Sequence, residues 1–265
     1  MIIAGRTALL TGATGGIGQA IARRLHRAGA DLVLTGRRSD VLEPLAAELG
    51  GRTRVVAVDL ADRDAVGRLA ADCLDVDILV ANAALPASGP LLDFTPQEID
   101  RALDVNLRAP VILARLLGAE MAARGAGQLV FISSLAGKTA TPGSSLYSAT
   151  KYGLRGFGRG LRSDLGPAGV GVSVVFPGFV RDAGMFHDSG VELPSYVGTS
   201  SPEDVAEGVC SAIEHDRAEV DVAPLGVRAG VKFAEIAPGL SDRLTERLGS
   251  REVADRLARG QSGKR

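Results

Sequence analysis

Short apolar segments alternate with amphipathic segments along most of the chain. The apolar segments are rich in Val, Ile and Leu, and they predict seven strands at 7–10, 31–35, 54–58, 77–81, 128–133, 171–176 and 219–222. Helical periodicity separates these strands, and long helices are expected at 95–124 and 145–165. Strands that alternate with helices form a parallel sheet covered on both faces. The pattern therefore predicts an α/β fold, a doubly wound parallel sheet in three α/β/α layers.

Composition limits the domain organisation and the partners. The chain has 265 residues and 46% apolar content, which is enough for a substantial core, and no linker-like stretch divides it. We therefore expect a single domain over residues 1–265. The net charge is −1, from 30 basic and 31 acidic residues, so nothing indicates a nucleic-acid-binding surface.

The cysteines and the N-terminus both favour a cytoplasmic protein. Cys73 and Cys210 are too few and too isolated for a disulfide framework, and neither they nor the three histidines have the spacing of a metal site. Residues 1–4 briefly resemble a signal sequence, but the glycine-rich segment that begins at Gly12 leaves no room for a cleavable leader. No apolar stretch reaches the roughly 20 residues that span a bilayer.

A glycine-rich segment follows the first predicted strand and precedes an amphipathic helix. Glycines there let a pyrophosphate approach main-chain N–H groups, and the helix N-terminus favours the anion. A glycine string alone is equally compatible with a flexible turn, but its position between strand and helix favours a Rossmann-type dinucleotide cradle. The predicted cradle residues are Gly12, Thr14, Gly15, Gly16, Ile17 and Gly18.

The end of the second predicted strand indicates which dinucleotide is preferred. A carboxylate at this place would bind the ribose 2′-hydroxyl of NAD, but the chain has Gly36, Arg37 and Arg38 instead. Guanidinium groups suit a 2′-phosphate, because they form bidentate, charge-assisted hydrogen bonds with it. We therefore expect NADP(H) to be preferred over NAD(H). The alternative is that one of the two, Arg38, is only a solvated residue at the start of a helix.

Tyr147 and Lys151, with Ser134 upstream, are candidates for proton transfer. On a helix, a spacing of four residues brings the phenol and the ammonium to one face, where the positive charge is expected to lower the pKa of the phenol. The Ser134 hydroxyl, at the end of a strand, could hydrogen-bond a substrate oxygen on which charge develops. The same Tyr-x-x-x-Lys spacing also occurs by chance, with a packed tyrosine and a solvated lysine.

Taken together, these motifs resemble the short-chain dehydrogenase/reductase family. The resemblance extends from about residue 6 to 222 and comprises seven marks in the expected order. They are Thr11-Gly12-x-x-x-Gly16-Ile17-Gly18, Asp59-Leu60, Asn82-Ala83-Ala84, Asn106, Ser133-Ser134, Tyr147-x-x-x-Lys151 and Pro177-Gly178.

The resemblance implies roles for these residues. Tyr147 would be the general acid/base, Lys151 would lower its pKa and hold the nicotinamide ribose, Ser134 would steady the substrate oxygen, and Asn106 would position a water in the proton relay. Asp59 and Leu60 would flank the adenine, and Asn82 would stabilise the central strands. The remaining residues expected at the cofactor are Ala83, Pro177, Gly178 and Val180.

Two positions depart from the family pattern. Ala84 stands where the family usually has glycine, which adds a methyl group near the cofactor without an expected loss of binding. Asp182 stands where the family often has a threonine that contacts the nicotinamide carboxamide. This leaves the carboxamide contact open.

The C-terminal third is less well defined by motifs. Residues 183–200 have the length and mixed polarity of a lid over the substrate, with a plain surface loop as the alternative. Residues 224–258 show helical spacing of apolar positions with mixed charges, which favours packing against a partner or the substrate pocket over membrane contact. Residues 259–265 are expected to be disordered.

The sequence thus predicts an oxidoreductase that uses a nicotinamide cofactor, preferably NADP(H), to interconvert a secondary alcohol and a ketone or aldehyde. An apolar small-molecule substrate is expected, and the family resemblance implies a homodimer or homotetramer formed through the two long helices. A cofactor-binding regulatory or scaffold protein with vestigial activity is the alternative. Enoyl-thioester reduction is disfavoured, because in the family it usually goes with a longer Tyr-to-Lys spacing.

Overall fold

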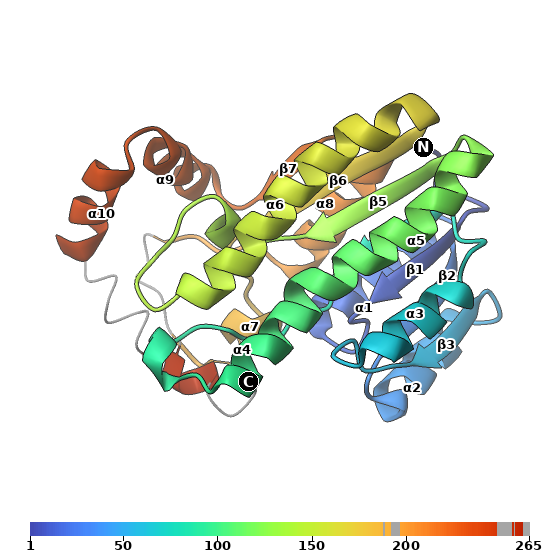
Figure 1. Cartoon of the computed structure of the whole chain (residues 1–265), viewed down its shortest axis with the longest axis horizontal. Helices are drawn as coiled ribbons and strands as arrows, with labels where there is room; N and C mark the ends of the chain where they lie inside the picture. Colours follow the sequence, from blue (N-terminus) through green and yellow to red (C-terminus); the bar gives the residue numbers. More distant parts are fainter. Residues whose placement is uncertain (188, 192–196, 248–255, 257, 262–265) are drawn as a thin grey trace.

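All seven strands belong to one parallel sheet in the computed structural model (Figure 1). The structure describes residues 1–187, 189–191, 197–247, 256 and 258–261. The strand order is β3-β2-β1-β4-β5-β6-β7, so the chain winds outward from β1 in two directions, and the predicted doubly wound architecture is confirmed. The strands are β1 (Thr7–Thr11), β2 (Asp31–Gly36), β3 (Thr53–Ala57), β4 (Ile78–Ala81), β5 (Gly127–Ile132), β6 (Val170–Pro177) and β7 (Glu219–Val222).

Helices cover both faces of the sheet. One face packs against α1 (Gly16–Arg27), α2 (Ser39–Leu49) and α8 (Pro202–Glu214). The other packs against α3 (Arg63–Ala71), α5 (Ala109–Arg124) and α6 (Ser145–Leu165). Alternate residues of each central strand enter the two cores, as Leu10 and Leu9 do on β1. This arrangement explains why the central strands are nearly continuous apolar runs.

The long helix expected at 95–124 is interrupted. α4 (Pro96–Leu103) begins with a capping box, in which Thr95 and Glu98 exchange side-chain and backbone hydrogen bonds. A π-helical turn at Asp104–Arg108 then separates α4 from α5. Such turns inside helices are often found at functional sites, and this one contains Asn106.

The C-terminal region lies beyond the edge of the sheet. α9 (Leu225–Ile236) buries Val231 and Ala234, and α10 (Pro238–Arg247) follows it on the outside of the molecule (Figure 1). The helical spacing predicted for 224–258 is present in both helices, while residues 248–255 and 257 lie outside the described part of the chain. No helix in the described part is long and apolar enough to cross a membrane.

Candidate active site

The glycine loop joins β1 to α1 and is packed too closely to admit side chains at two positions. A Cβ on Gly12, whose φ is +69°, would lie 2.7 Å from the Cα of Ala83, and a Cβ on Gly18 would lie 2.2 Å from the Gly12 carbonyl oxygen. The side chain of Asn82 donates to the carbonyls of Thr11 and Gly12 at 3.1 and 3.2 Å. The loop is therefore fixed against the end of β4, where the sheet changes its winding direction.

The N-terminus of α1 is open to an anion. Its N-cap residue, Gly15, makes no side-chain capping bond, and no acidic residue lies in the first turn, whereas three basic residues lie in the last. By contrast, Asp62, Thr95 and Ser201 cap α3, α4 and α8 with their side chains. The free N–H groups and the helix dipole at Gly15 thus favour a bound phosphate group.

The two arginines after β2 differ in their contacts. Arg38 donates from Nη2 to the carbonyl oxygen of Thr14 at 3.0 Å and so helps to hold the glycine loop. Arg37 is exposed, and it makes no hydrogen bond or ion pair with the residues that the structure describes. Arg37 is therefore the arginine that can turn fully toward a 2′-phosphate. Arg38 is also the exposed N-cap residue of α2, so the alternative of a helix-start residue agrees with its position.

Asp59 and Leu60 follow β3, at the same end of the sheet as the glycine loop. The Asp59 carboxylate accepts a hydrogen bond from the backbone N–H of Ala61 at 3.0 Å and pairs with Arg101 of α4 at 3.2 Å. Leu60 is buried in the core beside α3. These contacts fix the turn that the sequence assigns to the adenine, and the adenine contact itself stays a prediction.

Ser134, Tyr147 and Lys151 come together at the end of β5. Ser134 begins a short 3₁₀ turn, η3 (Leu135–Gly137), and its hydroxyl accepts from the backbone N–H of Ala136 at 3.2 Å. The Lys151 ammonium donates to the carbonyl oxygen of Ile132 at 2.9 Å and lies 5.6 Å from the centre of the Tyr147 ring. As the sequence predicts, the spacing of four residues on α6 brings the side chains of Tyr147 and Lys151 together.

Burial shifts the pKa values of both side chains of this pair. Burial raises the pKa of Tyr147 to about 12, and a hydrogen bond with Ser134 offsets only part of this rise. Burial also lowers the pKa of Lys151 to about 8. Burial is thus the largest influence on the phenol, and the prediction that Lys151 lowers the pKa of Tyr147 stays a prediction.

Asn106 is fully buried and bound to the loop after β4. Its Oδ1 accepts from the backbone N–H of Leu85 at 2.6 Å, and its Nδ2 donates to the Leu85 carbonyl at 2.9 Å. The side chain thus ties the segment that follows Asn82 to the π-helical turn. Sequence reasoning did not find this role, and the water contact expected of Asn106 stays a prediction.

The segment after β6 lies over the glycine loop. Gly178 donates from its backbone N–H to the carbonyl of Val222 at 3.0 Å, and the buried Val180 pairs with Ser200 in an isolated bridge. A Cβ on Gly16 would lie 2.4 Å from the Cβ of Ala183. Ala183 therefore contacts the glycine loop at Gly16, and the cofactor roles expected of Pro177, Gly178 and Val180 stay predictions.

Asp182 occupies an unusual backbone conformation. Its φ is +64°, and the N–H of Ala183 donates to the carbonyl of Arg181 at 2.8 Å, which makes a three-residue turn. The Asp182 carboxylate is 72% exposed and pairs with Arg181 at 3.4 Å. Aspartate tolerates this region of backbone space better than threonine does, which gives a structural reason for the departure from the family pattern.

The described part of the lid contacts both the site and the C-terminus. Phe186 of α7 (Gly184–His187) lies against Phe179, with ring centres 5.1 Å apart. The carbonyl of Met185 accepts from the buried side chain of Gln261 at 3.1 Å. The prediction of disorder is thus wrong for residues 259–261, which are helical. Residues 188, 192–196 and 262–265 lie outside the description.

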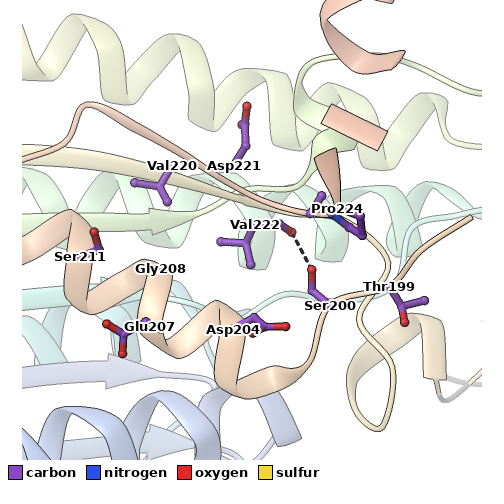
Figure 2. Close-up of a pocket in the computed structure, with 11 residues that line it drawn as sticks. Thr199, Ser200, Asp204, Glu207, Gly208, Ser211, Val220, Asp221, Val222 and Pro224 are labelled. Carbon is purple, nitrogen blue, oxygen red and sulfur yellow. Dashed lines mark hydrogen bonds between the residues drawn. The ribbon is translucent and has the colours of Figure 1, made fainter. Parts of the chain in front are cut away.

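Two further observations concern metal-ligating residues and a groove away from these residues. Among them, no cluster of three His, Cys, Asp or Glu side chains could hold a metal ion. An open groove of about 490 Å³ lies between α8 and β7 (Figure 2), and none of the predicted site residues lines it. Its acidic residues have structural partners, because Asp204 takes part in the capping box of α8, Glu207 pairs with Arg24 and Asp221 pairs with Lys138.

Comparison with known proteins agrees with the motifs. Residues 6–192 match the family model described as short chain dehydrogenase. Nodulation protein G of Rhizobium sp. (strain N33) is 42% identical over 185 residues, which cover 68% of this chain and 76% of that protein. Ketoacyl reductase HetN of Nostoc sp. is 35% identical over 227 residues, covering 83% of this chain and 79% of that protein.

Solved structures give the same result. A short-chain dehydrogenase from Sphingobium yanoikuyae, in complex with NADPH, is similar with a TM-score of 0.77 and 27% identity, covering 89% of this chain and 96% of that one. Since the family model spans well over half of the sequence, the chain belongs to the short-chain dehydrogenase family of oxidoreductases.

Proposed function

We propose that the protein is an oxidoreductase that uses NADP(H) in preference to NAD(H) to interconvert a secondary alcohol and a ketone or aldehyde. The observation that carries this proposal is the convergence of Ser134, Tyr147 and Lys151 at the end of β5. The phenol interacts with the Ser134 hydroxyl, and the ammonium binds the carbonyl of Ile132, two residues before that serine. A proton donor, a hydrogen-bond donor and a cation thus meet at one place.

The residues next to this place fit a dinucleotide. The closely packed glycines, the uncapped N-terminus of α1 and the free Arg37 are matched to a pyrophosphate and a 2′-phosphate. The bound nicotinamide would supply or accept the hydride. Arg37 would bind the 2′-phosphate, while Arg38 would keep the glycine loop in place through Thr14.

The raised pKa of Tyr147 suits it to act as an acid. With a pKa of about 12, the phenol keeps its proton at neutral pH and can donate it to a carbonyl oxygen as negative charge develops there. The Ser134 hydroxyl accepts from the Ala136 N–H and bonds the Tyr147 phenol, and its O–H would turn to the same carbonyl oxygen when a substrate binds. The chain's own groups therefore favour carbonyl reduction.

The lid supports an apolar substrate. Phe179 and Phe186 pack together on the segment that follows β6. This segment lies at the end of the sheet that carries the catalytic residues. A ketoacyl compound is one candidate class, since a relative that is 35% identical is named a ketoacyl reductase. We propose that this aromatic pair contacts the apolar part of the substrate.

Cofactor binding and turnover test this proposal together. The purified protein would be titrated with NADPH and with NADH by fluorescence, and NADPH consumption would then be followed against 3-oxoacyl thioesters, ketones, aldehydes and quinones. We expect tighter binding of NADPH and turnover of at least one carbonyl class. Binding without turnover across the whole panel would favour the regulatory alternative. A preference for NADH would contradict the role of Arg37.

A further inference from the structure

Two acidic side chains of the edge strand β7 point into the interior of the protein. Its sequence alternates, and Val220 and Val222 face α8 while Asp221 points to the opposite face of the strand (Figure 2). Glu219 lies on the same face as Asp221 and, like it, is largely buried, with 23% and 12% of the two side chains exposed. Buried carboxylates require cationic partners.

A lysine next to the catalytic serine is the first of these partners. Lys138 follows the η3 turn that begins at Ser134, and only 2% of its side chain is exposed. Its ammonium pairs with Asp221, and with Glu219 at 3.0 Å. It also lies 4.0 Å from the centre of the Phe176 ring, in a cation–π contact. Lys138 therefore fixes the far end of the turn that carries Ser134.

An arginine on the catalytic helix is the second partner. Arg155 lies on α6 one turn after Lys151, and its Nε pairs with Glu219 at 3.0 Å. Its Nη1 binds Glu235 of α9 at 2.5 Å. Glu219 thus bridges Lys138 and Arg155, and Glu235 extends the network to the C-terminal helix. We call Lys138, Arg155, Glu219, Asp221 and Glu235 the β7 charge cluster.

The two glutamates of this cluster have lowered pKa values. Burial alone would raise the pKa of Glu219, but hydrogen bonds from Arg155 and Lys138 bring the pKa below its ordinary value. Burial would also raise the pKa of Glu235, but the hydrogen bonds and charges of Arg155 and Lys232 together bring it below its ordinary value. Glu219 and Glu235 therefore take part in the cluster as carboxylates, each paired with Arg155.

Stability alone does not account for so many buried charges at one place. Replacing a buried ion pair with apolar residues is often neutral or stabilising, because desolvation offsets the Coulomb attraction. The location of the cluster gives it another use. One member is attached to the Ser134 turn and another to the helix of Tyr147 and Lys151, and the two are joined through Glu219 of β7.

We propose that Lys138 and Arg155 are positioning residues, which hold the Ser134 turn and the catalytic helix in register through Glu219 and couple both to α9 through Glu235. This inference rests on the proposed function. Neither residue contacts the predicted reacting groups directly, so they act through the placement of Ser134 and Tyr147. A small displacement of a catalytic group is known to cost a large factor in rate.

Steady-state kinetics of Lys138→Met and Arg155→Met test this inference. We expect kcat for carbonyl reduction to fall by roughly 10- to 100-fold in each variant, while the Kd for NADPH stays within about 3-fold. Arg155→Lys should recover part of the loss. The matched control is Arg162→Met, because Arg162 lies on the same helix and pairs with Asp216 at 2.7 Å, but this pair makes no contact with the cluster. It should keep wild-type kcat.

A companion variant separates positioning from simple unfolding. Lys138→Met leaves two buried carboxylates with one cation fewer, so Lys138→Met/Asp221→Asn restores the charge balance and should fold more readily. We expect a native unfolding transition with a reduced kcat. Wild-type kcat in both Lys138 variants would overturn the inference and leave the proposed function intact. A wild-type protein without any carbonyl turnover would overturn both.

Discussion

The glycine loop after β1 and the lid after β6 both lie at the cofactor end of the sheet, but they are held in different ways. The glycine loop is fixed locally, by backbone contacts that only glycine allows and by Asn82. The described part of the lid is held by distant partners, since Ser200 pairs with Val180 and Met185 with Gln261. Local constraints leave a motif in the sequence, whereas distant contacts between ordinary residues leave none.

Gly18→Ala should have the largest effect, because it disrupts the close backbone packing that fixes the glycine loop. The added Cβ would lie 2.2 Å from the Gly12 carbonyl oxygen, which is backbone and cannot rotate away. We expect the free energy of unfolding to fall by about 3 kcal/mol, as measured by urea denaturation.

Gly15→Ala is the matched control for this prediction. The nearest atom to a Cβ on Gly15 lies 3.7 Å away, an ordinary contact distance, so stability should change by less than about 0.5 kcal/mol. Equal losses in the two variants would show that the loop is not fixed by close packing.

Lys151 lies between the two regions and gives a prediction about pH. Burial lowers its pKa to about 8 in the folded protein, from 10.5 as the ordinary value. Between these values the unfolded chain binds more protons, so this group makes the wild type more stable as pH rises from 8 toward 10. Relative to Lys151→Met, the gain should be on the order of 2 kcal/mol.

Denaturation of both proteins at pH 8 and pH 10 measures this gain. The range ends at pH 10 because Tyr147 has the opposite effect above it. Its folded-state pKa is about 12, so above pH 10 the unfolded chain loses this proton first and stability falls. A constant difference between wild type and Lys151→Met across this range would contradict the lowered pKa of Lys151.

The two arginines after β2 test which residue determines the preference for NADPH over NADH. Arg37→Ala should raise the Kd for NADPH by roughly 10- to 100-fold and leave NADH binding unchanged, because it removes a charge-assisted bond to the 2′-phosphate. Arg38→Ala should weaken both cofactors by a similar, smaller factor, since Arg38 holds Thr14 of the glycine loop. Fluorescence titrations measure both, and an equal loss of NADPH and NADH in Arg37→Ala would contradict its role.

Asp182 tests how the lid begins, and its expected effect is the smallest. At φ +64° glycine is unstrained, so Asp182→Gly should relieve strain and raise the free energy of unfolding by about 0.5–1 kcal/mol. The greater entropy of glycine in the unfolded chain reduces this gain. Asp182→Ala should lower it, because alanine lacks the tolerance of aspartate for this conformation. Stabilisation by alanine would show that the turn is not strained.

The sequence predicts the sheet and the close-packed glycine turn between β1 and α1 well, because both depend on local patterns of residues. Every strand was located to within a few residues, since apolar runs bounded by turns report burial directly. The π-helical turn at Asn106 and the turn at Asp182 were missed, because each depends on a backbone geometry that neighbouring residues do not specify. The packing of Gln261 on Met185 spans 76 residues and leaves no local signal.

The pairing of charges shows the same limit. Lys138, Arg155 and Glu219 read as ordinary polar residues in three separate segments, and only the fold brings them together. The pKa values of Tyr147 and Lys151 also depend on burial, which the spacing of the two residues does not reveal. Residue type and spacing thus identify candidate groups, while the fold determines their protonation.

The most direct test of the central claim is the turnover of Tyr147→Phe with NADPH and a carbonyl substrate of the wild type. Tyr152→Phe, on the same helix and 42% exposed, is the control. We predict that both variants bind NADPH as the wild type does, that Tyr152→Phe keeps its turnover, and that Tyr147→Phe loses at least roughly 100-fold in kcat. Turnover of Tyr147→Phe at the wild-type rate would contradict the account.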